Sequence, residues 1–165
     1  MGNFISVLTQ GMSSKEEKDI IAFLSKHGEL GKLQPKDRVV LAKLVELRKV
    51  VKGAVVFKEG DTGEEMFLVK TGAVKIYKMS LLGERVLTTV NPGGFFGEMA
   101  LIDKSPRSAY AKVEVDTELL VIGQRKYEEV KKMNPSIAIG LMEILLQSFT
   151  VRLRDVTQKI LGVMG

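Results

Sequence analysis

The sequence contains no cysteine among its 165 residues. A disulfide framework, a thiolate metal site and a cysteine nucleophile are therefore excluded, and a reducing cytoplasm is the expected location. Histidine is nearly absent as well, because His27 is the single example. With no cysteine and no second histidine to join it, His27 does not indicate a metal site, and we expect it on the surface or at a helix cap.

Long apolar runs are also missing. No uninterrupted apolar stretch approaches the roughly 20 residues that cross a bilayer. The N-terminus lacks the charged start and apolar stretch of a secretion signal. Residues 1–6, MGNFIS, match the short N-myristoylation pattern at Gly2, but this pattern often arises by accident, and a frayed terminus is the alternative. We expect a soluble protein, with no membrane partner.

Charge of one sign is not concentrated in any segment. The net charge is +5, yet Lys and Arg are interspersed with Glu and Asp along nearly every segment. This pattern is typical of solvated mixed-charge faces, with the excess helping to attract an anionic ligand, and we expect no nucleic acid partner. With 45% apolar and 27% charged residues, the composition fits one domain, residues 30–165, after an extension, residues 1–29, that holds one helix.

Motifs for catalysis are absent. The sequence has no Ser/His/Asp or Cys/His constellation and no P-loop ending in Gly-Lys-Ser/Thr. Glu98 and Asp103 could be named as a carboxylate pair, but no other catalytic group accompanies them. We therefore expect neither an enzyme nor a cofactor.

The sequence does contain the parts of a small phosphate pocket. Residues 93–101 read GGFFGEMAL, and residues 106–109 read PRSA. The glycines allow positive φ and a close backbone approach, so that free N–H groups can point at an anion. Arg107 supplies a permanent cation that binds phosphate oxygens in pairs. Glu98 would repel a bare phosphate, so its expected partner is a hydroxyl donor such as a ribose 2′-OH.

This motif resembles the phosphate-binding cassette of the cyclic-nucleotide-binding domain family, in which Phe-Gly-Glu-(apolar)-Ala-Leu precedes Arg-(small)-Ala. The similarity includes KEGD at 58–61 and FLVKTGAV at 67–74 and covers about residues 30–160. It implies cAMP or cGMP as the ligand, with Glu98 on the ribose 2′-OH and Arg107 on the phosphate. The implied ligand-binding residues are Phe96, Gly97, Glu98, Met99, Ala100, Arg107, Ser108 and Arg152.

Periodicity predicts helices at both ends and strands between them. A capping box at Ser14–Glu17 opens a helix ending near Gly28, a second helix runs from Lys36 to Val51, and a long one runs from Pro135 to about Leu161. Strands are expected at 54–58, 66–70, 73–79, 85–90, 109–115 and 118–122. Short strands between glycine turns indicate a sandwich or roll. The family resemblance implies a mainly β double-stranded β-helix (jelly-roll) with N-terminal helices and a C-terminal lid helix.

The last helix is where the resemblance places signalling. Residues 151–157, VRLRDVT, look like the family's lid over the base. Arg152 is the favoured contact and Thr157 the second choice, while a solvated helix face is the alternative. Ser108 follows the motif arginine, and the residue found at that position in other family members favours cAMP over cGMP. The helix also carries an apolar face whose residues are spaced by three and four: Ile137, Leu141, Ile144, Leu145, Phe149, Leu153, Val156 and Ile160. This face indicates either a homodimer through the helix or a helix that covers the roll.

No output domain is visible in the sequence. We therefore expect a sensor that passes the state of its lid helix to an unknown protein effector in trans or to a second copy of itself. Two alternatives remain: a scaffold roll that has lost its ligand, and a fragment of a larger effector.

Overall fold

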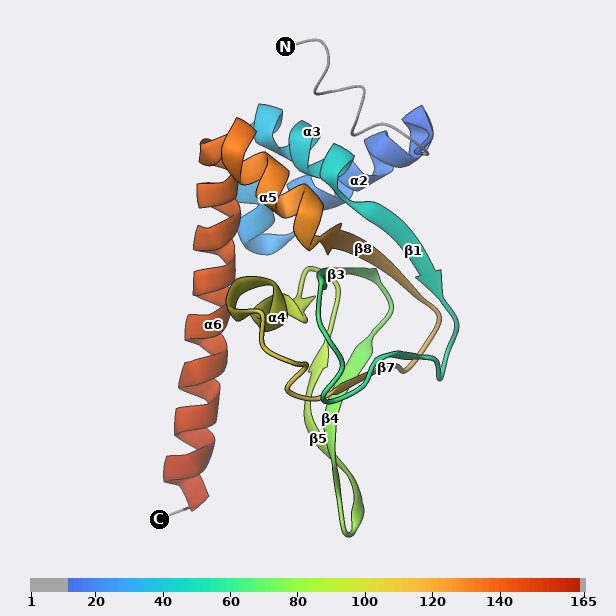
Figure 1. Cartoon of the computed structure of the whole chain (residues 1–165), viewed down its shortest axis with the longest axis vertical. Helices are drawn as coiled ribbons and strands as arrows, with labels where there is room; N and C mark the ends of the chain where they lie inside the picture. The colour runs from blue at the N-terminus through green and yellow to red at the C-terminus, as the bar shows by residue number, and fades with distance from the viewer. Residues whose placement is uncertain (1–11, 164–165) are drawn as a thin grey trace.

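The computed structural model describes residues 12–163 of the chain, so the Gly2 pattern lies outside the described residues. Helices gather at one end, strands form a roll beside them, and one long helix runs past both (Figure 1). The elements are α2 (Ser14–Lys26), the 3₁₀ helix η1 (Gly28–Lys32), α3 (Pro35–Leu44), β1 (Glu46–Val50), β2 (Val55–Phe57), β3 (Glu65–Thr71), β4 (Val74–Ser80), β5 (Gly83–Val90), β6 (Phe95–Phe96), α4 (Glu98–Asp103), β7 (Tyr110–Val113), β8 (Thr117–Gly123), α5 (Gln124–Met133) and α6 (Pro135–Val163).

The strands form two four-stranded antiparallel sheets. One has the order β1-β8-β3-β6 and the other β2-β7-β4-β5. In the first sheet β3 pairs with β8 through Phe67 opposite Val121, and the same Phe67 lies opposite Phe96 of β6. This arrangement confirms the predicted β-roll with flanking helices, and it places the glycine-rich loop beside the buried strand β3.

Strands β3 and β8 form a wall with a hydrophobic cluster on each side. Their alternate residues face opposite ways, as strand geometry requires. Met66, Leu68, Leu120 and Ile122 pack with the helices, in one cluster with residues of α2, α3, α5 and α6. The intervening residues fill the roll, in a second cluster made of Phe67, Val69, Val74, Val90, Phe96, Ala111, Val113, Leu119 and Val121.

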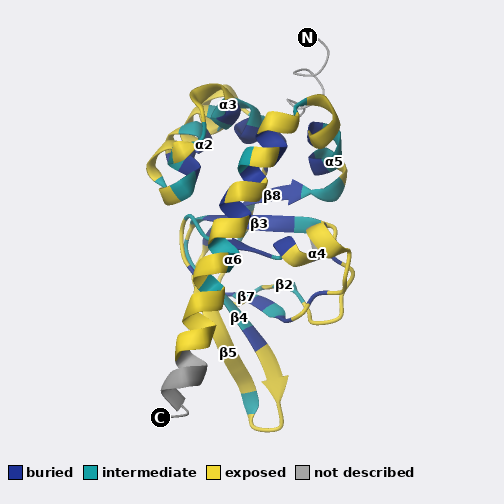
Figure 2. Cartoon of the chain, turned by 90° about the vertical axis from the view of Figure 1, so that its left-hand side faces the viewer, coloured by how far each residue is buried: buried dark blue, intermediate teal, exposed yellow. Residues whose placement is uncertain are grey.

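Helix α6 belongs to the core along its first half only. Ile137, Leu141 and Leu145 are buried in the helical cluster, whereas the second half extends along the roll with most of its surface exposed (Figure 2). The apolar segment Pro135–Gln158 has a mean hydropathy of 1.4, and 28% of its most apolar window is buried. By length and composition alone it could span a membrane, but charged residues interrupt it, and its N-terminal half forms part of a protein core.

Two local predictions were wrong, and one helix was missed. The helix expected over Lys36 to Val51 ends at Leu44, because β1 completes the first sheet by pairing Glu46–Val50 with β8. Helix α5 was not predicted, since Tyr127 and Val130 are its two buried residues and give little apolar pattern. The capping box is formed by Ser13 and Glu16, one residue earlier than expected, and both of its hydrogen bonds are present.

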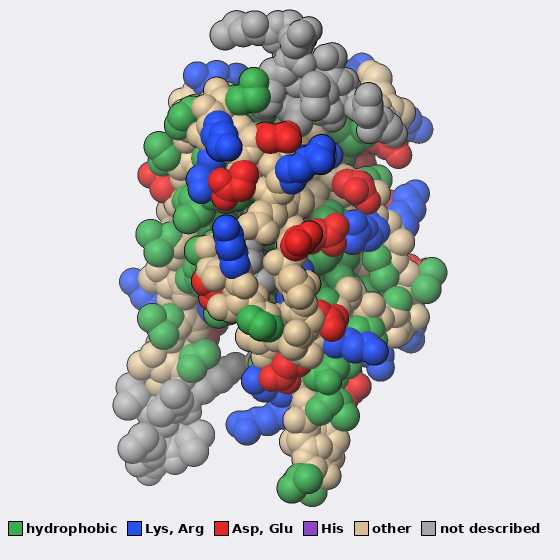
Figure 3. Space-filling view, viewed as in Figure 1, with side chains coloured by type: hydrophobic (Ala, Val, Ile, Leu, Met, Phe, Trp, Pro, Cys, Tyr) green, Lys and Arg blue, Asp and Glu red, His purple; other side chains and the backbone are tan. Residues whose placement is uncertain are grey.

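Two exposed surfaces are rich in apolar side chains. The β4–β5 hairpin carries Leu81 and Leu82 fully exposed at its tip, and it extends beyond the rest of the roll (Figure 1). Exposed residues on α6 include Ile139, Met142, Leu146, Leu153 and Val156. Elsewhere on the face shown in Figure 3, basic and acidic side chains are interleaved, in keeping with the mixed-charge pattern of the sequence.

Candidate functional site

The glycine-rich loop between β5 and α4 brings its backbone against Arg107. Gly97 has φ +73°, a conformation that side chains other than glycine rarely adopt. A Cβ at this position would lie 2.8 Å from Nη1 of Arg107 and 3.2 Å from the ring of Phe67. Gly93 also has positive φ, whereas Gly94 does not; a Cβ on Gly94 would instead lie 2.6 Å from Val90 Cγ1. The expectation of positive φ was therefore correct for Gly97 and Gly93 and wrong for Gly94.

Arg107 is a buried cation held by carbonyl groups. Its side chain is 6% exposed. Nη1 donates to the carbonyl oxygen of Gly97 at 2.7 Å, and Nη2 donates to the carbonyl oxygen of Glu65 at 2.7 Å. The guanidinium carbon lies 4.3 Å from the ring centre of Phe57. Burial lowers the pKa of Arg107, and the negative charges of Glu65, Asp61 and Glu98 partly oppose this effect.

No carboxylate among the described residues forms an ion pair with Arg107 within 4 Å. Its Nε is buried and has no hydrogen-bond partner within the described part of the chain. A buried guanidinium with two carbonyl partners and an unpaired N–H retains most of its charge for another acceptor. The geometry therefore suits an incoming anion.

Glu98, the first residue of α4, is the buried carboxylate of the same region, at 3% exposed. Its Oε1 accepts a hydrogen bond from Arg152 Nη1 of α6 at 2.6 Å. The other guanidinium nitrogen of Arg152 donates to the carbonyl oxygen of Phe95. Glu98 Oε2 has no hydrogen-bond partner among the described residues. One oxygen of this carboxylate is thus paired with the last helix, and the other can accept a hydroxyl donor.

These groups line one cavity of about 100 Å³. Seven of the eight predicted residues are among those that line it: Phe96, Gly97, Glu98, Met99, Arg107, Ser108 and Arg152. The eighth, Ala100, follows in α4, and its side chain lies outside those the structure describes. Ser108 is exposed at the cavity edge. The cavity is smaller than the roughly 300–1,000 Å³ typical of small-molecule pockets.

Not all predicted contacts have the same character. Phe96 is buried in the roll core, where its ring stacks on Phe67 with centres 4.9 Å apart. Arg152 joins the last helix to the cassette through its hydrogen bond to Glu98, and its predicted contact with the ligand stays a prediction. The hydroxyl of Thr157 donates to the carbonyl oxygen of Leu153 within its own helix. Phe57, Ile76 and Thr88 also line the cavity and were not predicted. They come from distant strands, and no local motif signals them.

The comparisons with known proteins point to one family. A family model described as "Cyclic nucleotide-binding domain" matches residues 47–134. The cyclic AMP receptor protein of Thermus thermophilus is 34% identical over 124 residues, covering 74% of this chain and 56% of that protein. The cAMP-dependent protein kinase regulatory subunit of Hypocrea atroviridis is 29% identical over 108 residues, covering 66% of this chain and 22% of that protein. The chain thus spans about half, or less, of these relatives.

A solved structure shares the fold over most of the chain. It is a cyclic nucleotide-binding domain from Methylobacillus flagellatus KT, with a TM-score of 0.79 and 25% sequence identity. The match covers 90% of this chain and 84% of that one. The similarity therefore includes flanking helices as well as the roll.

Proposed function

Since the chain belongs to the cyclic-nucleotide-binding domain family, we propose that it is a sensor that binds a cyclic nucleotide rather than an enzyme, with cAMP preferred to cGMP. One observation carries the proposal: a buried donor, Arg107 Nε, and a buried acceptor, Glu98 Oε2, lack partners among the described residues and belong to residues lining one cavity. Unsatisfied buried polar atoms are rare in folded proteins. A ligand with both an anionic group and a hydroxyl would satisfy both atoms.

The roles of these residues follow from their chemistry. In this proposal the phosphodiester lies beside Arg107 and the backbone N–H groups of Gly97 to Ala100, with the Ser108 hydroxyl at the edge. The ribose 2′-OH donates to Glu98 Oε2. Arg152 can keep its bond to Glu98 Oε1 while the sugar occupies the other oxygen. The preference for cAMP is supported by Ser108 and by relatives whose names include cAMP.

Helix α6 is the proposed signalling element. The cavity is smaller than a typical small-molecule pocket, and α6 contributes Arg152 to its wall. We infer that this helix moves when the ligand enters. The β-roll is fixed by strand pairing on both sides of β3 and β8, while the second half of α6 is mostly exposed. A ligand that changes the position of α6 would signal to a protein effector in trans in the cytoplasm.

A second copy of the chain is a candidate partner for the same helix. Ile139, Met142, Leu146, Leu153 and Val156 are exposed, and partly buried Phe149 completes a spacing that alternates between three and four residues. This spacing is typical of a coiled-coil seam. The stripe differs from the buried residues Ile137, Leu141 and Leu145, which already pack in the core.

Calorimetry tests the proposed binding. We expect cAMP to bind with roughly micromolar affinity, about 8 kcal/mol, and cGMP to bind more weakly. Arg107→Leu should lose most of this affinity because the buried cation is removed. Arg125→Leu is the matched control, since Arg125 is an exposed arginine on α5 whose side chain is 92% accessible. Binding that survives Arg107→Leu would refute the site, and no binding of either nucleotide would favour a scaffold function.

A further inference from the structure

Glu65 is a carboxylate close to Arg107 that could compete with an anionic ligand for this cation. Its carbonyl oxygen accepts a hydrogen bond from Arg107 Nη2 at 2.7 Å, so the residue that holds the guanidinium also carries a carboxylate. Among the charges that act on Arg107, that of Glu65 has the largest effect. If this carboxylate turned to Arg107, it would form an ion pair and compete with any anionic ligand.

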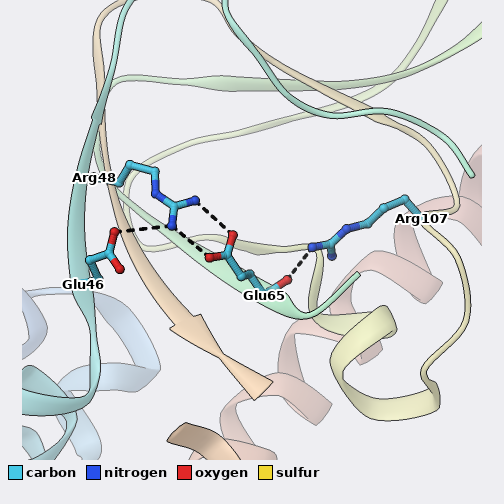
Figure 4. Close-up of polar contacts among 4 residues, drawn as sticks. All are labelled: Glu46, Arg48, Glu65 and Arg107. Carbon is cyan, nitrogen blue, oxygen red and sulfur yellow. Dashed lines mark hydrogen bonds and ion pairs between the residues drawn. The ribbon is translucent and has the colours of Figure 1, made fainter. Parts of the chain in front are cut away.

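Arg48 of β1 holds that carboxylate away. Its Nη1 donates to Glu65 Oε2 at 3.0 Å, and its Nη2 donates to Glu65 Oε1 at 2.9 Å. Figure 4 shows the result: the Glu65 side chain points to Arg48, while its backbone oxygen faces Arg107. The paired geometry uses both carboxylate oxygens. Hydrogen bonds from Arg48 also hold the pKa of Glu65 below its usual value, so the carboxylate stays ionised.

We propose that Arg48 is a positioning residue for the anion site: by binding both oxygens of Glu65, it keeps that carboxylate off Arg107 and leaves the Arg107 cation free for the ligand phosphate. This inference rests on the proposed function. It assigns a binding role to a residue of β1, a strand that contributes no residue to the lining of the cavity. Glu46 lies 3.4 Å from the same guanidinium and is a second, weaker partner of Arg48.

A set of charge variants separates this role from a merely structural one. Arg48→Met leaves Glu65 with an uncompensated charge, and we expect cAMP affinity to fall about tenfold, the size expected for one added charge near the buried Arg107 cation. Glu65→Gln alone should bind at least as well as wild type. The double variant, Arg48→Met with Glu65→Gln, should recover to within about threefold of wild type. Arg48→Lys keeps the charge but cannot bind both oxygens in the paired geometry, so its affinity should fall between those of Arg48→Met and wild type.

The outcomes distinguish the possible failures. A double variant as weak as Arg48→Met would mean that Arg48 acts only by stabilising the fold, and wild-type affinity in Arg48→Met would also overturn the inference. If wild type binds no cyclic nucleotide, the proposed function fails by itself. A crystal structure of Arg48→Met then still decides the point: the Glu65 carboxylate should lie at ion-pair distance from Arg107, and a carboxylate that stays turned away would contradict us.

Discussion

The unpaired oxygen of Glu98 leads to a prediction about the ligand's sugar. If the ribose 2′-OH donates to Oε2, then 2′-deoxy-cAMP leaves that oxygen buried and unpaired. Glu98 is only 3% exposed, so water cannot easily replace the lost donor. A hydrogen bond to a charged group contributes about 1.5–3 kcal/mol. Wild type should therefore bind 2′-deoxy-cAMP roughly 10- to 150-fold more weakly than cAMP.

The same experiment in Glu98→Ala completes a thermodynamic cycle. Without the carboxylate, the 2′-hydroxyl of cAMP has no acceptor at this position. The two ligands should then bind equally within about threefold. Arg152 can turn to solvent in this variant, since its side chain is already 39% exposed. Glu128→Ala is the control, because Glu128 pairs with Lys131 on the surface of α5. Calorimetry with both ligands measures all six affinities.

Two results would refute this reasoning. If wild type does not discriminate between the two ligands, the sugar hydroxyl does not reach Glu98. If Glu98→Ala still discriminates as strongly as wild type, another residue recognises the hydroxyl. A general loss of affinity for both ligands in Glu98→Ala, without loss of discrimination, would assign Glu98 to the stability of the cassette alone.

Three further predictions concern α6 and the Glu65 pair. Arg152→Leu removes the partner of Glu98 and should destabilise the chain by about 1–2 kcal/mol in urea unfolding, less than for a fully buried pair because Arg152 is partly exposed. An unchanged urea midpoint would mean that the Arg152–Glu98 pair contributes nothing to stability. If α6 pairs two copies, replacing Leu153 and Val156 by Asp should give a monomer in light scattering, and a wild type that is monomeric at high concentration would exclude the dimer. Because the pKa of Glu65 is lowered in the folded chain, its contribution to the free energy of unfolding is present above the usual pKa near 4.5 and is lost as pH falls through the lower folded value. Glu65→Gln should remove this acid-induced loss. An identical dependence of unfolding on pH in the variant would show that the pair contributes no stability.

The sequence predicted the cassette better than its surroundings. Gly97, Glu98 and Arg107 lie within 11 residues, so one local motif carried both the anion and the hydroxyl chemistry. Alternation in β3 was also visible, because Phe67 and Val69 face one cluster while Met66 and Leu68 face the other. Arg152 was found by resemblance, although its bond to Glu98 spans 54 residues.

The missed features depend on pairing between distant segments. The apolar residues Leu47 and Val51 continue the spacing of the preceding helix, and only pairing with β8 makes Glu46–Val50 a strand. The ring of Phe57 in β2 lies against Arg107 of the loop before β7, and the bond from Arg48 to Glu65 joins β1 to β3, so each contact links segments that are separated in the chain. No local periodicity encodes such contacts, because they arise only after the two sheets have formed.

The crowded backbone at Gly97 has a consequence for how such rolls diverge. Position 97 cannot take a side chain while Arg107 keeps its place, since its φ is +73° and a Cβ there would lie 2.8 Å from Arg107 Nη1. In a relative that no longer binds the ligand, selection no longer keeps Gly97 or Arg107. Once a larger side chain is fixed at 97, restoring the arginine alone can no longer restore binding. A relative that has lost this glycine is therefore expected to have lost the binding site as well, whatever residue it carries at the arginine position.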